Sequence, residues 1–207
     1  CELVSFGLNT PTWWACAMAD YDRDGRIDLY FSRVNTSMNR LYRNEGDRTF
    51  KLMAFKDVGQ VASANTWGGP CWGDMDDDGW PDLYLPSNQG SQSLMFRNEG
   101  NGHFASVANL VTRTSTSAIA GAWGDYDNDG RLDLFITNLE ENQPNALYQG
   151  DDTGVFTRQD VWPFNQDKQR SGSGAWADYD NDGYLDIFVC NNQIDQMNFL
   201  YRNRTDG

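Results

Sequence analysis

The stretch GAWGDYDNDGRLDLFI, residues 121–136, decides how the rest of the chain is interpreted. Within it, residues 125–133 have the form Asp-x-Asp-x-Asp-Gly-x-x-Asp. The same form recurs at 20–28, 74–82 and 178–186, with successive starts 54, 51 and 53 residues apart. We number these segments loops 1 to 4 in chain order, and their residues positions 1 to 9. Self-similarity at a period near 50 residues indicates a solenoid or a propeller built from repeated units.

The sequence around each loop repeats as well. Trp72, Trp123 and Trp176 stand two residues before loops 2 to 4, where loop 1 has Met18. An apolar run such as Leu134-Phe135-Ile136 follows each loop, and a segment such as Leu41-Tyr42-Arg43-Asn44 comes later in the unit. Runs that are apolar on both faces predict strands covered on both faces. Each unit therefore predicts an antiparallel blade of four strands, with the three tryptophans buried between blades. No segment has convincing helical periodicity.

The acidity of the chain is concentrated in the loops. Among 207 residues there are 30 acidic and 16 basic side chains, a net charge of −14. Aspartates at motif positions 1, 3, 5 and 9 of the four loops account for 16 of the acids, so the remaining 14 nearly balance the bases. Such a charge argues against binding to nucleic acid or to an anionic membrane. No apolar run approaches the roughly 20 residues of a membrane span. The first residues show no basic region or apolar stretch of a signal peptide, so we expect a processed product.

The loop residues fit a calcium site. Oxygen ligands at alternate positions, followed by a glycine that permits a sharp turn, are typical of calcium-binding loops. Three residues beyond position 9 the chain is apolar (Phe31, for example), so the bidentate glutamate of an EF-hand is absent and position 9 supplies the last ligand. Oxygen donors without His or Cys disfavour zinc and copper. We expect about four Ca²⁺ ions, one in each loop. The predicted ligands are the side chains of Asp20, Asp22, Asp24, Asp28, Asp74, Asp76, Asp78, Asp82, Asp125, Asp127, Asp129, Asp133, Asp178, Asp180, Asp182 and Asp186, with the position-7 carbonyls of Arg26, Trp80, Arg131 and Tyr184.

These motifs, together with the following Leu-Tyr-Arg-Asn segments, resemble the FG-GAP/VCBS repeats, which also build the calcium-binding blades of integrin α-chain propellers. The resemblance covers essentially the whole chain. It implies a β-propeller, extracellular in most members, that serves adhesion, ligand recognition or scaffolding without catalysis. The family's usual ring has about seven blades, whereas this chain has four copies of the loop.

We therefore expect an all-β fold, a β-propeller of four-stranded antiparallel blades, as a single domain over residues 1–207. The fourth unit lacks its final strand, and residues 1–8 resemble the end of a unit, so we expect this segment to complete the last blade. A closed ring of four blades is favoured. The alternative is that the four blades form part of a larger ring of seven or eight.

Other residues suggest ligand contacts and covalent features. Flat aromatic rings outside the strict repeat are candidates for stacking on sugars or partner side chains, namely Trp13, Trp14, Trp67 and Trp162. A disulfide between Cys16 and Cys71 is one expectation; the alternative is that Cys71 fills a small-residue site, held by alanine in the other units. Asn35 and Asn203 begin glycosylation sequons.

No residue pattern indicates an enzyme. The single histidine, His103, follows Gly102 in a predicted turn, and there is no nucleophile motif or phosphate-binding loop. We predict a non-enzymatic, secreted or cell-surface calcium-binding propeller for adhesion or ligand recognition. Its expected partner is an extracellular protein or glycan, with structural calcium and without membrane insertion. The alternative is a structural subunit of an extracellular assembly or filament, which would associate with itself.

Overall fold

The computed structural model describes residues 13–33, 39–53, 68–88, 90–114, 117–160, 164, 166, 168–193 and 195–204. Its strands form four antiparallel sheets, and within each sheet the strands lie side by side in chain order. Blade 1 contains β1 (Trp13–Ala19), β2 (Asp28–Arg33), β3 (Arg40–Gly46) and β4 (Thr49–Leu52). Blade 2 contains β5 (Cys71–Gly73), β6 (Asp82–Leu85), β7 (Leu94–Gly100) and β8 (His103–Ser106). Blade 3 contains β9 (Ala118–Gly124), β10 (Asp133–Asn138), β11 (Ala146–Gly150) and β12 (Phe156–Gln159). Blade 4 contains β13 (Ser171–Ala177), β14 (Asp186–Asn191) and β15 (Phe199–Tyr201).

The sheets are the blades of a four-bladed β-propeller, so the fold class predicted from the sequence is confirmed. Blade 4 has three described strands, and residues 1–8, predicted to complete it, lie outside the described residues.

One short helix, α1 (Leu110–Thr114), follows β8 and was not predicted. The Asn109 side chain starts it by accepting a hydrogen bond from the Thr112 amide at 3.1 Å. His103, expected in a turn, begins β8 instead and is exposed.

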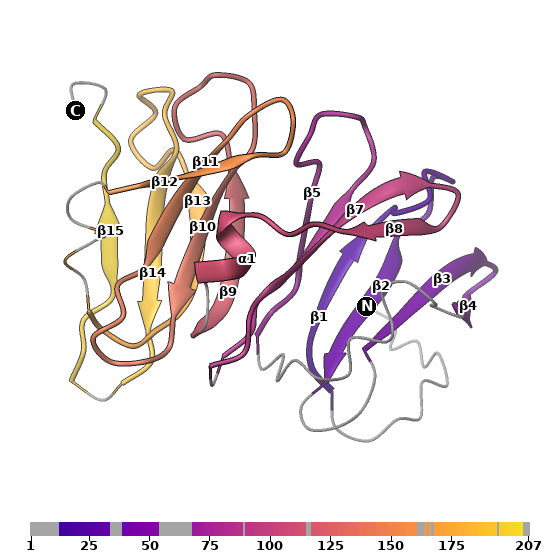
Figure 1. The fold of residues 1–207 in the computed structure, drawn as a ribbon, viewed down its shortest axis with the longest axis horizontal. Helices are drawn as coiled ribbons and strands as arrows, with labels where there is room; N and C mark the ends of the chain where they lie inside the picture. Colours follow the sequence, from indigo (N-terminus) through magenta and orange to yellow (C-terminus); the bar gives the residue numbers. More distant parts are fainter. Residues whose placement is uncertain are drawn as a thin grey trace.

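Every loop joins the first strand of its blade to the second. The position-9 aspartate is the first residue of the second strand, and it pairs with the residue just before the loop, as Asp133 does with Gly124. All four loops therefore leave the sheets at the same end, the upper side of Figure 1.

Adjacent blades pack through two different faces. The leading face of a blade carries the aromatic residue of the second strand, such as Tyr30 or Phe135, and the trailing face carries the tryptophan before the loop. The Trp72 ring packs 6.0 Å from Tyr30 of blade 1, and the Trp176 ring packs 6.0 Å from Phe135 of blade 3. The tryptophans thus lie between blades, as predicted, although their side chains are half-buried rather than fully buried.

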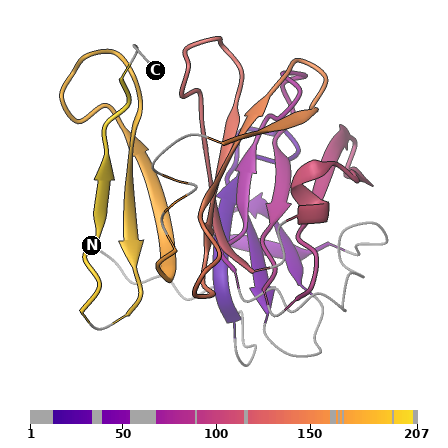
Figure 2. The same cartoon turned by 60° about the vertical axis from the view of Figure 1, so that its left-hand side comes forward.

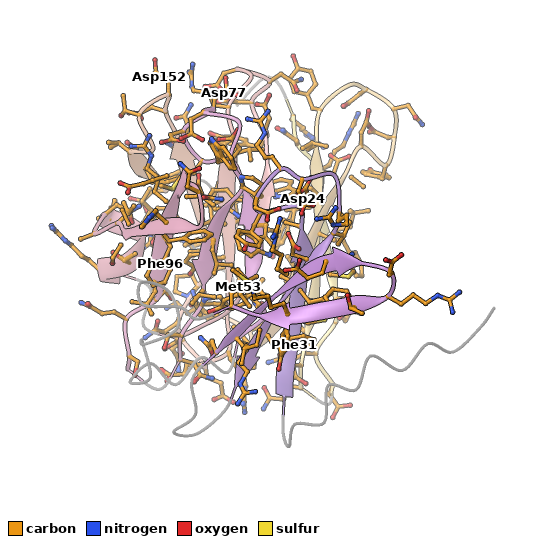
Figure 3. All side chains as sticks on the ribbon, turned by 90° about the vertical axis from the view of Figure 1, so that its right-hand side faces the viewer. Asp24, Phe31, Met53, Asp77, Phe96 and Asp152 are labelled. Atoms are coloured by element: carbon orange, nitrogen blue, oxygen red, sulfur yellow. The ribbon has the colours of Figure 1, made fainter. Side chains whose placement is uncertain are left out.

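The cores between blades repeat the same arrangement. The large apolar residues of the second and third strands on the leading faces of blades 1 to 3 are at most 1 % exposed, namely Tyr30, Leu41, Tyr84, Met95, Phe135 and Leu147. They join trailing-face residues of the next blade in three apolar clusters, one for each successive pair of blades. In Figure 3, Met53 and Phe96, which belong to the core between blades 1 and 2, lie below the loop residues Asp24 and Asp77.

The outermost faces differ from these. Phe188 and Leu200, on the leading face of blade 4, are 41 % and 50 % exposed, and Met18, on the trailing face of blade 1, is 65 % exposed. Strand contacts join β1 to β5, β5 to β9, and β9 to β13. Blade 4 lies at one side of the molecule, as Figures 1 and 2 show. The leading faces of blades 1 to 3 are each covered by the next blade. Among the described residues, no further blade covers the leading face of blade 4.

The predicted disulfide between Cys16 and Cys71 is wrong, because both residues are free thiols in the structure. The cause is the register of the strands. Cys71 pairs with Tyr84 across the sheet, and the equivalent of Tyr84 in blade 1, Tyr30, pairs with Ala17. Cys16 is therefore one residue out of step with Cys71, and neighbouring residues of a strand point to opposite faces. Cys71 occupies the small-residue site, as the alternative proposed, whereas Cys16 is exposed.

Candidate metal centres

The position-1 aspartate folds each loop. In loop 3, Asp125 accepts hydrogen bonds from the amides of Asp129 at 3.0 Å and Gly130 at 2.9 Å, and the same pair of bonds forms in the other three loops. Gly130 has φ of 88°, which explains the glycine at position 6. Position 4 is also left-handed, with φ of 59° at Asn128. Asparagine tolerates this conformation, and it occupies position 4 in loops 3 and 4.

The position-9 aspartate connects the loop to the third strand of its blade. Asp133 accepts hydrogen bonds from the Tyr126 amide at 3.0 Å and the Gly150 amide at 3.0 Å. Asp28, Asp82 and Asp186 accept the corresponding pairs of bonds in the other loops. Burial raises the pKa of Asp28 to about 6, and the pKa values of Asp82 and Asp133 to about 7. A carboxylate that is expensive to ionise in isolation is stabilised by a nearby cation.

Three carboxylates converge in every loop. One oxygen from each lies within 4.8 Å of the other two, and each triad could hold a metal ion. The triads are Asp20, Asp22 and Asp28; Asp74, Asp76 and Asp78; Asp125, Asp127 and Asp133; and Asp178, Asp180 and Asp186. Twelve of the sixteen predicted aspartate ligands therefore come together. The other four, Asp24, Asp82, Asp129 and Asp182, belong to the same loops but not to these triads.

Position 5 fixes the backbone of position 7. Asp129 Oδ1 accepts the Arg131 amide hydrogen at 2.9 Å, and Asp24, Asp78 and Asp182 accept the amide hydrogens of Arg26, Trp80 and Tyr184 in the same way. Ligation through the carbonyls of these position-7 residues stays a prediction.

The position-3 aspartates carry an oxygen that fits a cation. Oδ1 of Asp22, Asp76 and Asp180 is buried and has no hydrogen-bond partner. The Asp76 side chain is only 9 % exposed. A buried carboxylate oxygen without a donor is costly, and a metal ion would satisfy it. The four loops supply oxygen donors only, which suits a hard cation that accepts many oxygen ligands, as Ca²⁺ does.

Sequence reasoning did not identify the residue that holds the second oxygen of position 3. Arg43 Nε lies 2.5 Å from Asp22 Oδ2, Arg97 Nε 2.6 Å from Asp76 Oδ2, and Arg202 Nε 2.6 Å from Asp180 Oδ2. These arginines belong to the repeated segment after each loop, so the signal was present in the sequence. In blade 3 the residue is Gln149, whose Nε2 donates to Asp127 Oδ2 at 2.5 Å.

Neighbouring loops contact one another. The Arg23 guanidinium of loop 1 lies 5.3 Å from the centre of the Trp80 ring in loop 2, and Asn128 of loop 3 donates to the Gly183 carbonyl of loop 4 at 2.9 Å. The side chain of Asn98, which is fully buried, links β7 to loop 1 by donating to the Tyr21 carbonyl at 2.8 Å. Asn203 donates in the same way to the Tyr126 carbonyl at 2.6 Å. The amide of this predicted glycosylation site is therefore engaged between blades, and its modification stays a prediction.

The roles of the four aromatic ligand candidates stay predictions. Trp67 and Trp162 lie outside the described residues, as does Asn35, and the side chains of Trp13 and Trp14 in β1 are not described.

The structure contains a cavity of about 300 Å³ beside blade 3. It is lined mainly by polar side chains, among them Asn138, Asn142, Gln143 and Arg158. Sequence reasoning did not find it, because its lining combines residues of β10, β11 and β12 with residues of the β10–β11 connection.

No helix among the described residues has the length and apolar character needed to cross a membrane.

Similar proteins were found by sequence and by structure. The chain is 25 % identical over 200 residues to Cartilage acidic protein 1 of Xenopus tropicalis, covering 90 % of this chain and 30 % of that protein.

A lectin of Agrocybe aegerita, described as specifically recognising non-reducing terminal N-acetylglucosamine, matches with a TM-score of 0.59 and 19 % identity. That match covers 84 % of this chain and 46 % of the lectin, and it shows a shared fold. The family model for the FG-GAP-like repeat matches residues 20–85, 74–136 and 125–189, which together span all four loops. The chain belongs to the FG-GAP-like repeat family.

Proposed function

We propose that this chain is a non-enzymatic, extracellular calcium-binding propeller that recognises a protein or glycan ligand, with calcium in a structural role. The observation that carries the calcium assignment is the partnerless buried oxygen at position 3 of three loops, beside two further carboxylates. Calcium would supply a central charge to which the loop carboxylates converge. The chain's own residues hold those carboxylates in place through the amides of positions 5 and 6 and the third strand.

Calcium in these loops would stabilise the contacts between blades. Loop 1 touches loop 2 through Arg23 and Trp80, and loop 3 touches loop 4 through Asn128 and the Gly183 carbonyl. A loop that opens without metal would lose its share of these contacts. Titration of the metal-free chain with calcium, followed by calorimetry, tests the assignment: heat consistent with binding in several loops supports it, and no heat up to millimolar calcium refutes it.

Ligand recognition is supported by the polar cavity beside blade 3 and by the family. Amide and guanidinium groups such as those of Asn142, Gln143 and Arg158 suit the hydroxyl and carboxylate groups of a saccharide. The described function of the lectin with a similar fold is in keeping with this. A screen of glycans and matrix proteins in millimolar calcium tests the proposal. Loss of binding in Arg158→Ala would locate the ligand in the cavity, provided that Arg113→Ala, at an exposed arginine of α1, leaves binding unchanged. A uniformly negative screen refutes recognition.

A second candidate, a structural subunit that associates with itself, is favoured by the exposed leading face of blade 4. Phe188 and Leu200 are exposed there, whereas their equivalents Phe135 and Leu147 are at most 1 % exposed beneath blade 4. Light scattering separates the candidates. A monomer that binds a ligand supports recognition. An oligomer supports self-association if Phe188→Asp dissociates it and Val155→Asp, at another exposed position, leaves it intact.

A further inference from the structure

We propose that the residue on the third strand that holds the position-3 aspartate sets the calcium affinity of its loop, so that loop 3, with Gln149, binds calcium more tightly than loop 1, with Arg43. This inference rests on the proposed calcium function and extends it to unequal sites. Arg43 and Gln149 are positioning residues, because they act on the ion through Asp22 and Asp127.

Loops 1 and 3 form a matched pair. Both have four aspartates, and both have an arginine at position 7 that pairs with the position-5 carboxylate: Arg26 with Asp24, and Arg131 with Asp129. Loops 2 and 4 have Trp80 and Tyr184 at position 7 and lack this ion pair. The two loops also differ at position 4, where loop 1 has Arg23 against the Trp80 ring and loop 3 has Asn128. Exchanging the residues at positions 43 and 149 therefore isolates the third-strand residue, because it leaves position 4 unchanged.

The two third-strand residues hold the position-3 aspartate at the same distance. Arg43 Nε and Gln149 Nε2 each lie 2.5 Å from Oδ2 of the position-3 aspartate. The Gln149 amide is itself oriented, because its Oε1 accepts a hydrogen bond from Gln159 Nε2 at 3.0 Å. Both side chains thus orient Oδ2 of the position-3 carboxylate. The other oxygen differs, because Asp127 Oδ1 accepts the Asp129 amide hydrogen at 3.2 Å and Asp22 Oδ1 has no partner.

Charge does separate them. Arg43 brings a positive charge against two carboxylates of loop 1, since its Nη2 also lies 2.9 Å from Asp24 Oδ2. Two guanidinium groups, those of Arg26 and Arg43, pair with the aspartates of loop 1, whereas Arg131 alone pairs with those of loop 3. Arg43 Nη1 also lies 3.6 Å from Glu45 Oε1, at the far side of the guanidinium from Asp22. A guanidinium one carboxylate away, roughly 6 Å from a divalent ion, repels it by an amount that corresponds to about tenfold in affinity at the dielectric constant of water. The repulsion should weaken as salt screens it.

The glycines at position 6 allow each loop to be followed separately. The Gly25 amide donates to Asp20 Oδ2 and the Gly130 amide to Asp125 Oδ2, both at 2.9 Å. Because these carboxylates are predicted ligands, both amide signals should shift in nitrogen–proton NMR spectra when calcium binds. The experiment titrates the metal-free full chain with calcium at low salt and records the midpoint of each signal.

The expected result is a lower midpoint for Gly130 than for Gly25. Arg43→Gln should lower the Gly25 midpoint about tenfold, and Gln149→Arg should raise the Gly130 midpoint by a similar factor. Arg43→Lys, which keeps the charge, is the matched control and should leave the Gly25 midpoint within about twofold of the parent. Gly183 of loop 4 serves as an internal reference for the Arg43 variants, and Gly79 of loop 2 for Gln149→Arg.

Three outcomes would overturn the inference while calcium binding stands: equal midpoints in the parent chain, midpoints that the charge swaps do not move, or an Arg43→Lys midpoint that moves as far as that of Arg43→Gln. Circular dichroism of the variants shows whether they are folded, and the reciprocal swap provides a second reading if one variant is not. If none of the glycine signals shifts with calcium, the proposed calcium function itself fails.

Discussion

Replacing Gly124 by alanine tests the contact that joins blade 3 to blade 4. A Cβ built on Gly124 would lie 2.7 Å from Cδ1 of Trp176. Carbon atoms in contact prefer about 3.5–4.0 Å, so either the indole or the strand must move. The indole is held in place, because Trp176 Nε1 donates to the Ala122 carbonyl at 3.1 Å and the ring packs 6.0 Å from that of Phe135.

Overpacking of this kind costs typically about 1–3 kcal/mol. Ala19 stands at the equivalent position of blade 1, before loop 1, so the repeat can accept one extra methyl group after adjustment. We therefore expect Gly124→Ala to lower the free energy of unfolding by about 1–2 kcal/mol, or the melting temperature by about 2–8 °C. Urea unfolding in saturating calcium measures the loss. Gly172→Ala is the control, because the nearest atom to its added Cβ lies 3.5 Å away, and its effect should be small.

A double-mutant cycle identifies the cause. In the Trp176→Ala background the added methyl group meets no indole, so Gly124→Ala should then cost nothing. An equal loss in both backgrounds would show that the methyl group strains the chain in some other way, and the interblade contact would not explain the glycine.

Three further results are expected. In chelator, the free energy of unfolding should fall as the pH rises from about 4 to 7. Burial raises the pKa values of the position-9 aspartates of loops 1 to 3, so the folded chain holds more protons than the unfolded chain in this window. Thermal unfolding at pH 5 and pH 7.5 checks this, and a melting temperature that rises with pH contradicts it. Asn98→Ala should destabilise the chain by about 1–3 kcal/mol in urea unfolding, because it leaves the Tyr21 carbonyl without its buried donor; an unchanged midpoint would refute this. Mass spectrometry after alkylation of the native chain should find Cys16 modified and Cys71 protected, since Cys16 is exposed while burial raises the pKa of Cys71 to about 12. If both thiols are protected and a reductant makes both reactive, the two cysteines form a disulfide and this prediction is wrong.

The repeat predicted much of this molecule because each unit solves the same local problem. The spacing of aspartates around glycine predicted the loops, and the apolar runs after them predicted the second strands, such as β10. The tryptophans two residues before loops 2 to 4 lie between blades because each stands at the same position of its unit, and each unit packs against the adjacent blade in the same way. Twelve of the predicted ligands converge because alternate positions of a tightly turned loop face a common centre.

What the sequence did not predict depends on contacts between units. The Asn98 bond to loop 1 joins residues 77 positions apart, which no local pattern encodes. The cysteine pairing was wrong because a shift of one residue along a strand reverses the face of the side chain. The roles of Arg43 and Gln149 were missed because the repeated segment was interpreted as a strand alone, although the exchange of arginine for glutamine was visible. Helix α1 was missed because five residues are too few for a periodic signal.

The most direct test of the calcium assignment is thermal unfolding of the full chain in calcium, in chelator, and in chelator with magnesium, together with the metal content of the protein. Extracellular calcium modules have dissociation constants of roughly 0.1–1 mM. At about tenfold excess each independent site would add about 1.4 kcal/mol, and four sites about 5–6 kcal/mol. We expect calcium to raise the melting temperature by many degrees, magnesium to restore little of this, and Asp127→Ala or Asp180→Ala to remove part of it. Coincident curves in all three conditions, with metal content near zero, would contradict the assignment.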